Sequence, residues 1–246
     1  MKTTLRNAAV LLAGLALCGG AAAKTLRFSG YDWEVRNQGS SGPGPNVWDD
    51  DNAWLDAQGR LHLKIAKRGG QWTAAELYLP QRLGFGRYQF KLIGRPDQFD
   101  PNIVLGLFNY PTPDVGPDGS NEIDIEFSRW GSPSNPMGNY TVYPAQAGPQ
   151  STSYSFDFAL NGDYSTHRFD WNAGQVYYQS LHGFQDGDQY PIASWRFAPT
   201  DAARRVPQQP LPVHINLWLF QGKPPADGKE VEVVIQEFKF VPAAAR

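Results

Sequence analysis

The sequence has few of the features that cross-link a chain or anchor it in a membrane. Its 246 residues include a single cysteine, Cys18, so no disulfide can form within the chain. An apolar run near the N-terminus, residues 8–16, is shorter than the roughly 20 residues that a membrane-spanning helix needs, and no longer run follows it. We therefore expect a protein that is not embedded in a membrane and is held together by a large core instead of by cross-links.

An excess of positive charge is also absent. The chain has 22 Lys and Arg against 24 Asp and Glu, which gives a formal net charge of −2. Proteins that bind nucleic acid neutralise its phosphates with clustered basic residues, and this sequence has no basic cluster. The composition argues against a nucleic-acid partner, and the charge and length are compatible with a monomer.

The first 23 residues have the pattern of a secretory signal peptide. Two basic residues precede the apolar run, and an Ala-Ala-Ala sequence ends at Ala23. Cleavage there would leave residues 24–246 as one mature domain, located in the periplasm or outside the cell. The two lost basic residues would change the net charge from −2 to −4. Lipid attachment at Cys18 is an alternative, which Leu17, a poor residue directly before a lipidated cysteine, disfavours.

Short alternating segments separated by turn residues fill the rest of the chain. Residues 61–65 alternate apolar and polar side chains between glycines, as a half-buried strand does. No segment of the mature chain has a convincing 3.6-residue period. The pattern predicts an all-β antiparallel sandwich or barrel in one domain. Further strands are expected at residues 86–93, 166–171, 175–178, 214–220 and 231–241, and proline-rich loops at 111–117 and 207–212.

One segment, N-E-I-D-I-E-F at residues 121–127, places three acids on alternate positions of a predicted strand. Side chains of a strand alternate between its two faces, so Glu122, Asp124 and Glu126 share one face and the apolar residues share the other. Like charges on one face repel each other, and the solvated face of a sheet usually mixes charges of both signs. The arrangement therefore favours a functional role over a merely solvated face.

Two kinds of chemistry use aligned carboxylates. Hard cations such as calcium bind carboxylates, although calcium sites usually draw their ligands from a loop. Retaining glycosidases use two carboxylates about 5–5.5 Å apart, one as nucleophile and one as acid/base. Residues four apart on a strand have Cα atoms about 13 Å apart, so Glu122 and Glu126 would have to lean toward each other over a concave face. Asp124 between them could hydrogen-bond one and raise the pKa of the other.

The same segment, with its flanking strands, resembles glycoside hydrolase family 16, which includes lichenases, laminarinases, agarases and xyloglucan-modifying enzymes. The resemblance covers most of the mature chain. The matching segments are N-E-I-D-I-E-F, D-A-Q-G-R-L-H-L at 56–63, A-E-L at 75–77, G-F-G-R-Y at 84–88, F-D-W at 169–171 and N-L-W at 216–218. It implies a β-jelly-roll sandwich with a concave substrate cleft, and a polysaccharide as the partner.

By this resemblance, Glu122 is the nucleophile, Glu126 is the acid/base and Asp124 orients the pair. Many laminarinases insert a residue before the last Glu; this sequence does not, which is more similar to the lichenase and xyloglucan-modifying branch. The resemblance implies a retaining endo-glycosidase acting on β-1,3-1,4- or β-1,3-glucan. A transglycosylase with the same residues, or a lectin-like binding module on the same scaffold, remains as an alternative.

The resemblance also implies residues that contact the substrate. A core position is the alternative for the tryptophan on the strand at 166–171. The sequence departs from the family at Tyr78, where many relatives have Arg, and at Ser165, where relatives often have His. The chemistry needs no cofactor; the family allows a structural calcium ion, for which this sequence offers no ligand constellation. The expected substrate contacts are Glu76, Tyr110, Asn139, Tyr140, Trp171, Asn216 and Trp218.

Overall fold

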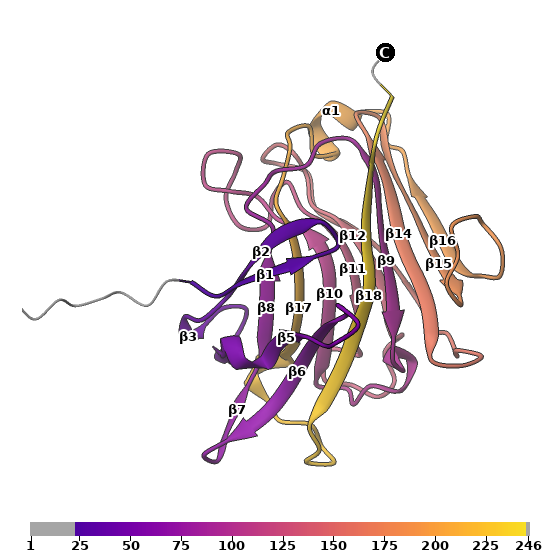
Figure 1. The fold of residues 1–246 in the computed structure, drawn as a ribbon. Helices are drawn as coiled ribbons and strands as arrows, with labels where there is room; N and C mark the ends of the chain where they lie inside the picture. Colours follow the sequence, from indigo (N-terminus) through magenta and orange to yellow (C-terminus); the bar gives the residue numbers. More distant parts are fainter. Residues whose placement is uncertain (1–22, 245–246) are drawn as a thin grey trace, which may run out of the picture.

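The computed structural model describes residues 23–244 (Figure 1). The predicted signal peptide lies outside these residues except for Ala23, and Cys18 lies outside them too, so cleavage and lipid attachment stay predictions. None of the helices in the described part of the chain is long and apolar enough to span a membrane.

Two large sheets and a small hairpin make up most of the structure. The first sheet contains, in spatial order, β1 (Thr25–Phe28), β2 (Tyr31–Val35), β8 (Ala75–Tyr78), β17 (Val213–Leu219), β10 (Ile103–Asn109), β11 (Ile123–Phe127), β12 (Gly138–Val142) and β13 (Thr152–Phe156). The second contains β16 (Pro191–Phe197), β15 (Gln175–His182), β14 (Tyr164–Asn172), β9 (Gly86–Ile93), β18 (Val231–Pro242), β6 (Leu61–Arg68) and β5 (Ala53–Leu55), with β7 (Gln71–Thr73) paired to β6. The hairpin consists of β3 (Gly39–Ser41) and β4 (Asn46–Trp48).

Helical segments are short. The described residues contain one α-helix, α1 (Ala202–Arg205), and three 3₁₀ turns at Asp50–Asn52, Pro96–Gln98 and Phe220–Gly222. Many neighbouring strands come from distant parts of the sequence, as β10 and β17 do, and the pairs within both large sheets are antiparallel. This topology confirms the predicted all-β jelly-roll sandwich, and all the strands expected from alternation are present.

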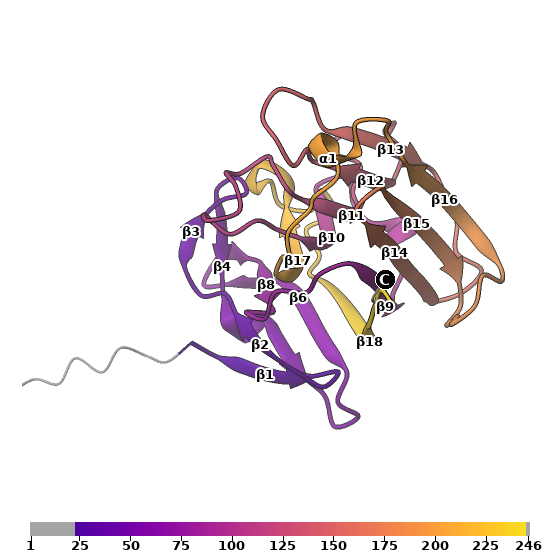
Figure 2. The same cartoon turned by 90° about the horizontal axis from the view of Figure 1, so that it is seen from above.

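The two large sheets face each other as layers, and the hairpin β3–β4 lies beside β8 of the first sheet (Figure 2). The inner faces of the two layers form one hydrophobic core. Ile123 and Ile125 of β11 and Tyr88 and Phe90 of β9 are fully buried there. Each such side chain contributes about 1.5–3 kcal/mol relative to exposure. Burial of Ile123 and Ile125 fixes which face of β11 points inward, and therefore which face its acids occupy.

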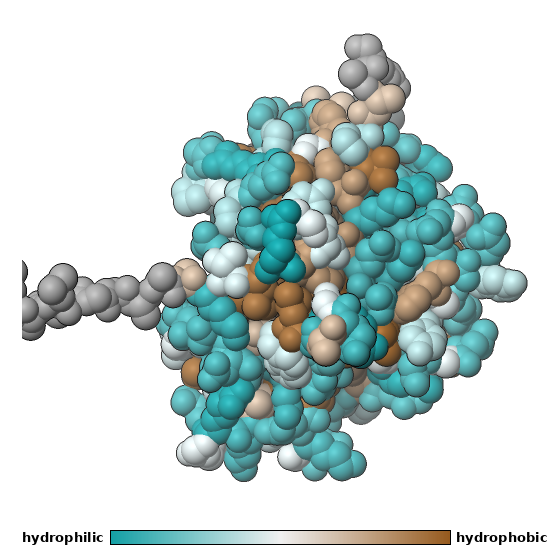
Figure 3. All heavy atoms as spheres, in the orientation of Figure 1, coloured by the Kyte–Doolittle hydropathy of each residue, from teal (hydrophilic) through white to brown (hydrophobic). Residues whose placement is uncertain are grey.

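The outer face of the second sheet is polar. Lys91 of β9 contacts Asp186 and Glu237 at 3.0 and 2.9 Å, and Arg87 pairs with Asp170 at 2.7 Å. The face of the molecule drawn in Figure 3 is mostly hydrophilic, with some hydrophobic residues gathered near its middle. An antiparallel sheet with one face on the core and one face in water has this distribution.

Candidate active site

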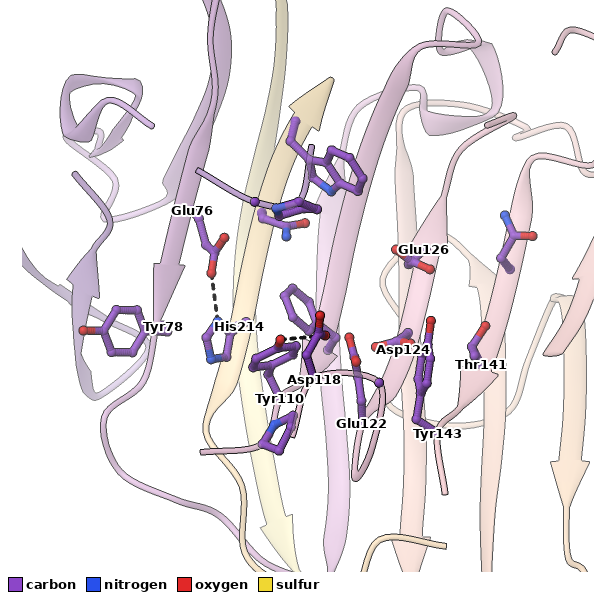
Figure 4. A pocket seen from close by; sticks show the side chains of 18 of the residues that line it. Glu76, Tyr78, Tyr110, Asp118, Glu122, Asp124, Glu126, Thr141, Tyr143 and His214 are labelled. Atoms are coloured by element: carbon purple, nitrogen blue, oxygen red, sulfur yellow. Dashed lines mark hydrogen bonds and ion pairs between the residues drawn. The ribbon is translucent and has the colours of Figure 1, made fainter. Parts of the chain in front are cut away.

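Glu122, directly before β11, and Asp124 and Glu126 on β11 line a pocket on the outer side of the first sheet. Because Ile123 and Ile125 point into the core, Glu122, Asp124 and Glu126 point the other way. They form part of the wall of a cavity of about 1280 Å³ (Figure 4). Asp124 is buried, whereas Glu122 and Glu126 remain partly exposed to the cavity. A cavity of this size accommodates several sugar units of a polymer.

The chain enters β11 through Asn121, whose φ of 50° lies in the left-handed region. Asparagine tolerates this region better than most residues. Its backbone N–H donates to the carbonyl of Pro144 at 3.0 Å, and its side-chain amide donates to that of Ala145 at 3.3 Å. These bonds fix the direction in which Glu122 leaves the turn.

The strands beside β11 shape the floor around Glu126. In the antiparallel register, Glu126 lies opposite Gly106 of β10 on one side and Asn139 of β12 on the other. Gly106 in turn lies opposite Asn216 of β17. A Cβ atom at Gly106 would lie 2.5 Å from Oδ1 of Asn216, so only glycine leaves room for that amide. The Oδ1 atom is buried and has no hydrogen-bond partner among the described residues.

Burial raises the pKa values of all three acids, and the charges of neighbouring acids add to the rise at Glu122 and Asp124. Burial, with the charge of Glu126 second, raises the pKa of Glu122 to about 8, and burial raises the pKa of Glu126 to about 7. The pKa of Asp124 lies well above its usual range because the group is buried beside the charges of both glutamates. A hydrogen bond between Glu122 and Asp124 partly offsets the rise in the pKa of Glu122 and adds to the rise in the pKa of Asp124. The three groups titrate as a unit that retains protons at neutral pH.

A second polar group lies on the same face, across β17 and β8. Glu76 contacts Arg36 at 2.8 Å and Nδ1 of His214 at 3.0 Å (Figure 4). Burial alone would raise the pKa of Glu76, but the hydrogen bonds and charges of His214 and Arg36 outweigh burial and lower it. Glu76 is therefore an ionised carboxylate with both oxygens engaged.

The loop between β10 and β11 brings a further acid to the cavity. Asp118 accepts a hydrogen bond from the hydroxyl of Tyr110 at 2.9 Å (Figure 4). The same loop is tied to the preceding part of the chain by two hydrogen bonds from Arg82 to Asp114, at 2.7 and 2.8 Å. Asp118 is thus held beside Glu122 by contacts at both ends of its loop.

Five of the seven expected substrate contacts line this cavity. They are Glu76, Tyr110, Asn139, Asn216 and Trp218, and they come from three strands, β8, β12 and β17, and from the end of β10. Their contact with a substrate stays a prediction, as do the roles assigned to Glu122, Asp124 and Glu126.

The expectation that Trp171 and Tyr140 line the cleft is wrong. Trp171 belongs to β14 of the second sheet, is 1% exposed, and donates its indole N–H to the carbonyl of Pro207 at 2.8 Å. Tyr140 neighbours Asn139 on β12 and therefore points to the opposite face, where its hydroxyl donates to Ser180 at 2.6 Å inside the core. Both side chains stabilise the sandwich between its layers.

Several residues that line the cavity are not among those expected from the sequence. The position of His214 could have been predicted, because alternation on its strand puts it on the same face as Asn216 and Trp218. The others, Arg36, Phe108, Asp118, Thr141 and Tyr143, reach the cavity through strand pairing and loop paths that local sequence does not reveal. Within residues 23–244, no group of three or more His, Cys, Asp or Glu is arranged to hold a metal ion.

Comparison with known proteins identifies the fold. No family model matches the sequence, and no curated protein matches it significantly. Among solved structures, the β-glucanase of Bacillus licheniformis is 19% identical with a TM-score of 0.65, covering 91% of this chain and 99% of that one. A glycoside hydrolase family 16 endo-glucanase from Bacteroides ovatus, in complex with G4G3G-2F-DNP, is 14% identical with a TM-score of 0.64, covering 85% and 94%.

An immunostimulatory antigen of Mycobacterium tuberculosis, described as a pseudo β-1,3-glucanase, also matches. It is 20% identical with a TM-score of 0.64, and the match covers 86% of this chain and 91% of that one. At such identities the likeness establishes the shared jelly-roll fold. The chemistry has to be argued from the residues of this chain.

Proposed function

We propose that the protein is a secreted, retaining endo-glycosidase that hydrolyses β-linked glucan, with β-1,3-1,4- or β-1,3-glucan as the substrate. The observation that carries the proposal is the row Glu122, Asp124 and Glu126 on the cavity face of β11, with raised pKa values. Three neighbouring acids in a partly buried site destabilise a protein, and glycoside hydrolysis is a reaction that requires such a group.

In the first step, the carboxylate of Glu122 attacks the anomeric carbon and forms a glycosyl-enzyme ester. Glu126 donates its proton to the glycosidic oxygen as the bond to the leaving sugar breaks. The raised pKa of Glu126 keeps this proton in place near neutral pH. Asp124, protonated and hydrogen-bonded to Glu122, orients the nucleophile and disperses its charge.

In the second step, Glu126 acts as a base. It takes a proton from a water molecule whose oxygen attacks the anomeric carbon, and the ester bond to Glu122 breaks. Two displacements on opposite faces of the sugar retain the anomeric configuration. The two carboxylates and a water molecule complete the reaction, so it needs no cofactor.

The shape of β11 supports the choice of substrate. Its register with β10 and β12 is continuous from residue 123 to residue 127, without a bulge before Glu126. This regular strand agrees with the resemblance to the lichenase and xyloglucan-modifying branch. Secretion is proposed from the signal-peptide pattern at residues 1–23.

Two other functions use the same scaffold. A transglycosylase would use the same three acids and pass the glycosyl group to a sugar hydroxyl instead of water. The second is a binding module without hydrolysis, and one structural neighbour of the same fold is described as a pseudo β-1,3-glucanase. The retention of all three acids in this chain favours hydrolysis over binding alone.

Digestion of polysaccharides tests the proposal. Purified residues 24–246 are incubated with lichenan, laminarin, xyloglucan and agarose, and the products are analysed beside those of Glu122→Gln. We expect oligosaccharides from a β-glucan with the unaltered protein, and a loss of several orders of magnitude with the folded variant. Equal product formation by Glu122→Gln would overturn the assignment. Longer products that appear only with added acceptor sugars would indicate a transglycosylase.

A further inference from the structure

The four histidines of the sequence differ in how their ring nitrogens are used. In His62, Nδ1 contacts Glu232 at 2.7 Å and Nε2 contacts Asp56 at 3.1 Å. In His167, the two nitrogens contact Ser180 and Ser165, both at 2.8 Å. In His214, only Nδ1 has a partner among the described residues. Its Nε2 is not a buried unpaired atom, so this nitrogen is open to the cavity that the residue lines.

Aromatic packing holds the ring of His214 in one orientation. Tyr78 stacks on it with ring centres 5.4 Å apart and an angle of 20° between planes. Phe108 and Tyr110 pack against it at 5.1 and 5.6 Å. The side chain is 14% exposed, so one edge of the ring reaches the cavity while its faces are covered. A ring fixed in this way is suited to present a single polar atom to a ligand.

Glu76 determines which nitrogen of the His214 ring carries the proton. It is ionised, and its Oε1 lies 3.0 Å from Nδ1, so it accepts a hydrogen bond from the Nδ1–H group. In the neutral ring, Nε2 is then the acceptor. The other oxygen of Glu76 accepts from Arg36, whose remaining donors bind Gln38, Ser41 and Gly42. Each oxygen of Glu76 thus already has a partner, whereas Nε2 of His214 has none among the described residues.

We propose that His214 is a specificity-determining residue whose Nε2 accepts a hydrogen bond from a hydroxyl group of a neutral glucan unit. Glu76 is its positioning residue instead of a direct sugar contact. The proposal rests on the proposed function and refines the same cleft. Apart from Arg36, which pairs with Glu76, the charged groups of the cavity are carboxylates, so an uncharged sugar fits this position better than an anionic one.

The sugar unit that His214 contacts is not the one being cleaved. His214 is on β17, which is separated from the catalytic strand β11 by β10. At about 4.8 Å between strands, the two positions lie roughly 10 Å apart. His214 therefore acts mainly through binding, and its removal should raise KM more than it lowers kcat.

Binding measured in the inactive Glu122→Gln background tests this inference. The probes are oligosaccharides of mixed-linkage β-glucan and of laminarin, titrated by calorimetry. His214→Phe keeps the aromatic packing and deletes Nε2, and we expect about tenfold weaker binding, the effect of one hydrogen bond. His62→Phe is the matched control, since His62 is also held by carboxylates and stacks on Trp54, but lies outside the cavity; it should leave binding unchanged.

A double-mutant cycle tests the role of Glu76. Because Glu76 acts through His214, the losses of binding in Glu76→Ala and His214→Phe should not add in the double variant. His214→Gln, which retains a polar group, serves as the second variant if His214→Phe does not fold, and it should weaken binding less than His214→Ala.

Several outcomes would overturn the inference. Unchanged affinity in folded His214→Phe, or in both His214→Gln and His214→Ala, excludes a contact through Nε2. An equal loss in His62→Phe identifies the effect as general destabilisation. Fully additive losses from Glu76→Ala and His214→Phe make Glu76 an independent contact. If the Glu122→Gln protein binds neither set of oligosaccharides and the unaltered protein hydrolyses no glucan, the proposed function fails together with the inference.

Discussion

The carboxyl group of Asp124 is hydrogen-bonded to that of Glu122, two residues earlier on the same face of β11. The bond requires that one of two neighbouring acids retains a proton, and Asp124, the more buried of the two, is the one that does. Glu126 follows on the same face with a raised pKa of its own. The row therefore retains protons at neutral pH, and Glu122 acts as a nucleophile once it has released its own proton. This protonation should be visible in stability as well as activity.

The stability of the protein should fall as pH rises through the range in which this row titrates. The folded pKa values of about 8 for Glu122 and about 7 for Glu126 exceed the ordinary glutamate value of 4.5, so the folded state binds more protons than the unfolded state between these limits. The stabilising contribution is complete below the unfolded pKa and is lost above the folded one. The slope approaches about 1.4 kcal/mol per pH unit for each extra proton.

Urea unfolding at a series of pH values measures this slope. Glu126→Gln should make it shallower between about pH 5 and pH 8. Glu230→Gln is the control: a hydrogen bond to Lys64 lowers the pKa of Glu230, so its contribution lies at lower pH. Equal slopes in Glu126→Gln and the unaltered protein would show that Glu126 does not titrate with a raised pKa.

Asp118 is not one of the three acids at 122, 124 and 126, but its charge should influence the pH dependence of activity. Burial and the charge of Glu126 raise the pKa of Glu122, and the charge of Asp118 adds to them. In Asp118→Asn that charge is lost, so Glu122 ionises more readily. The acidic limb of the kcat/KM profile should move to lower pH, by roughly 0.5 unit at low salt.

Asp114→Asn serves as the control for Asp118, because Asp114 is in the same loop but pairs with Arg82. It should leave the acidic limb in place. A shift of equal size in both variants would assign the effect to the loop, and a shift of Asp118→Asn to higher pH would contradict the electrostatic argument.

Trp171 and Trp218 should separate stability from substrate binding. Trp171→Phe removes a hydrogen bond and packing from the core, so the free energy of unfolding should fall by about 1–3 kcal/mol while KM is unchanged. Trp218→Phe reduces the aromatic surface at the cavity, so KM should rise severalfold. Thermal unfolding and steady-state kinetics on soluble β-glucan measure both. If KM increased for Trp171→Phe and not for Trp218→Phe, Trp171 and not Trp218 would be the residue that contacts the substrate.

Features that depend on local alternation of apolar and polar residues could be predicted from the sequence. The strict pattern of residues 121–127 determined both faces of β11, and the alternating segments marked the strands of both sheets. Motifs spread along the chain predicted the jelly roll, which turn and strand patterns alone left undecided between a sandwich and a barrel.

The errors arose where a position depends on long-range pairing. Trp171 is on an alternating strand, but β14 pairs with β9 and β15 in the second sheet, away from the cavity. Asn139 and Tyr140 are adjacent, so only one of them can face the cavity, and burial of Tyr140 against Tyr178 decides which. Arg36 reaches Glu76 across 40 residues of sequence, a distance over which no local pattern carries information.

The identity of the nucleophile and the acid/base is tested most directly by azide rescue of Glu126→Ala. Loss of Glu126 removes the acid of the first step and the base of the second, so activity on β-glucan should fall by several orders of magnitude. On an aryl β-glycoside whose leaving group needs no proton, azide, which needs no base, should restore turnover in part. With Glu122 as nucleophile, azide attacks from the face opposite the ester bond, and the product is a β-glycosyl azide. An α-glycosyl azide, or no rescue in a folded variant, would contradict the assignment of Glu122 and Glu126.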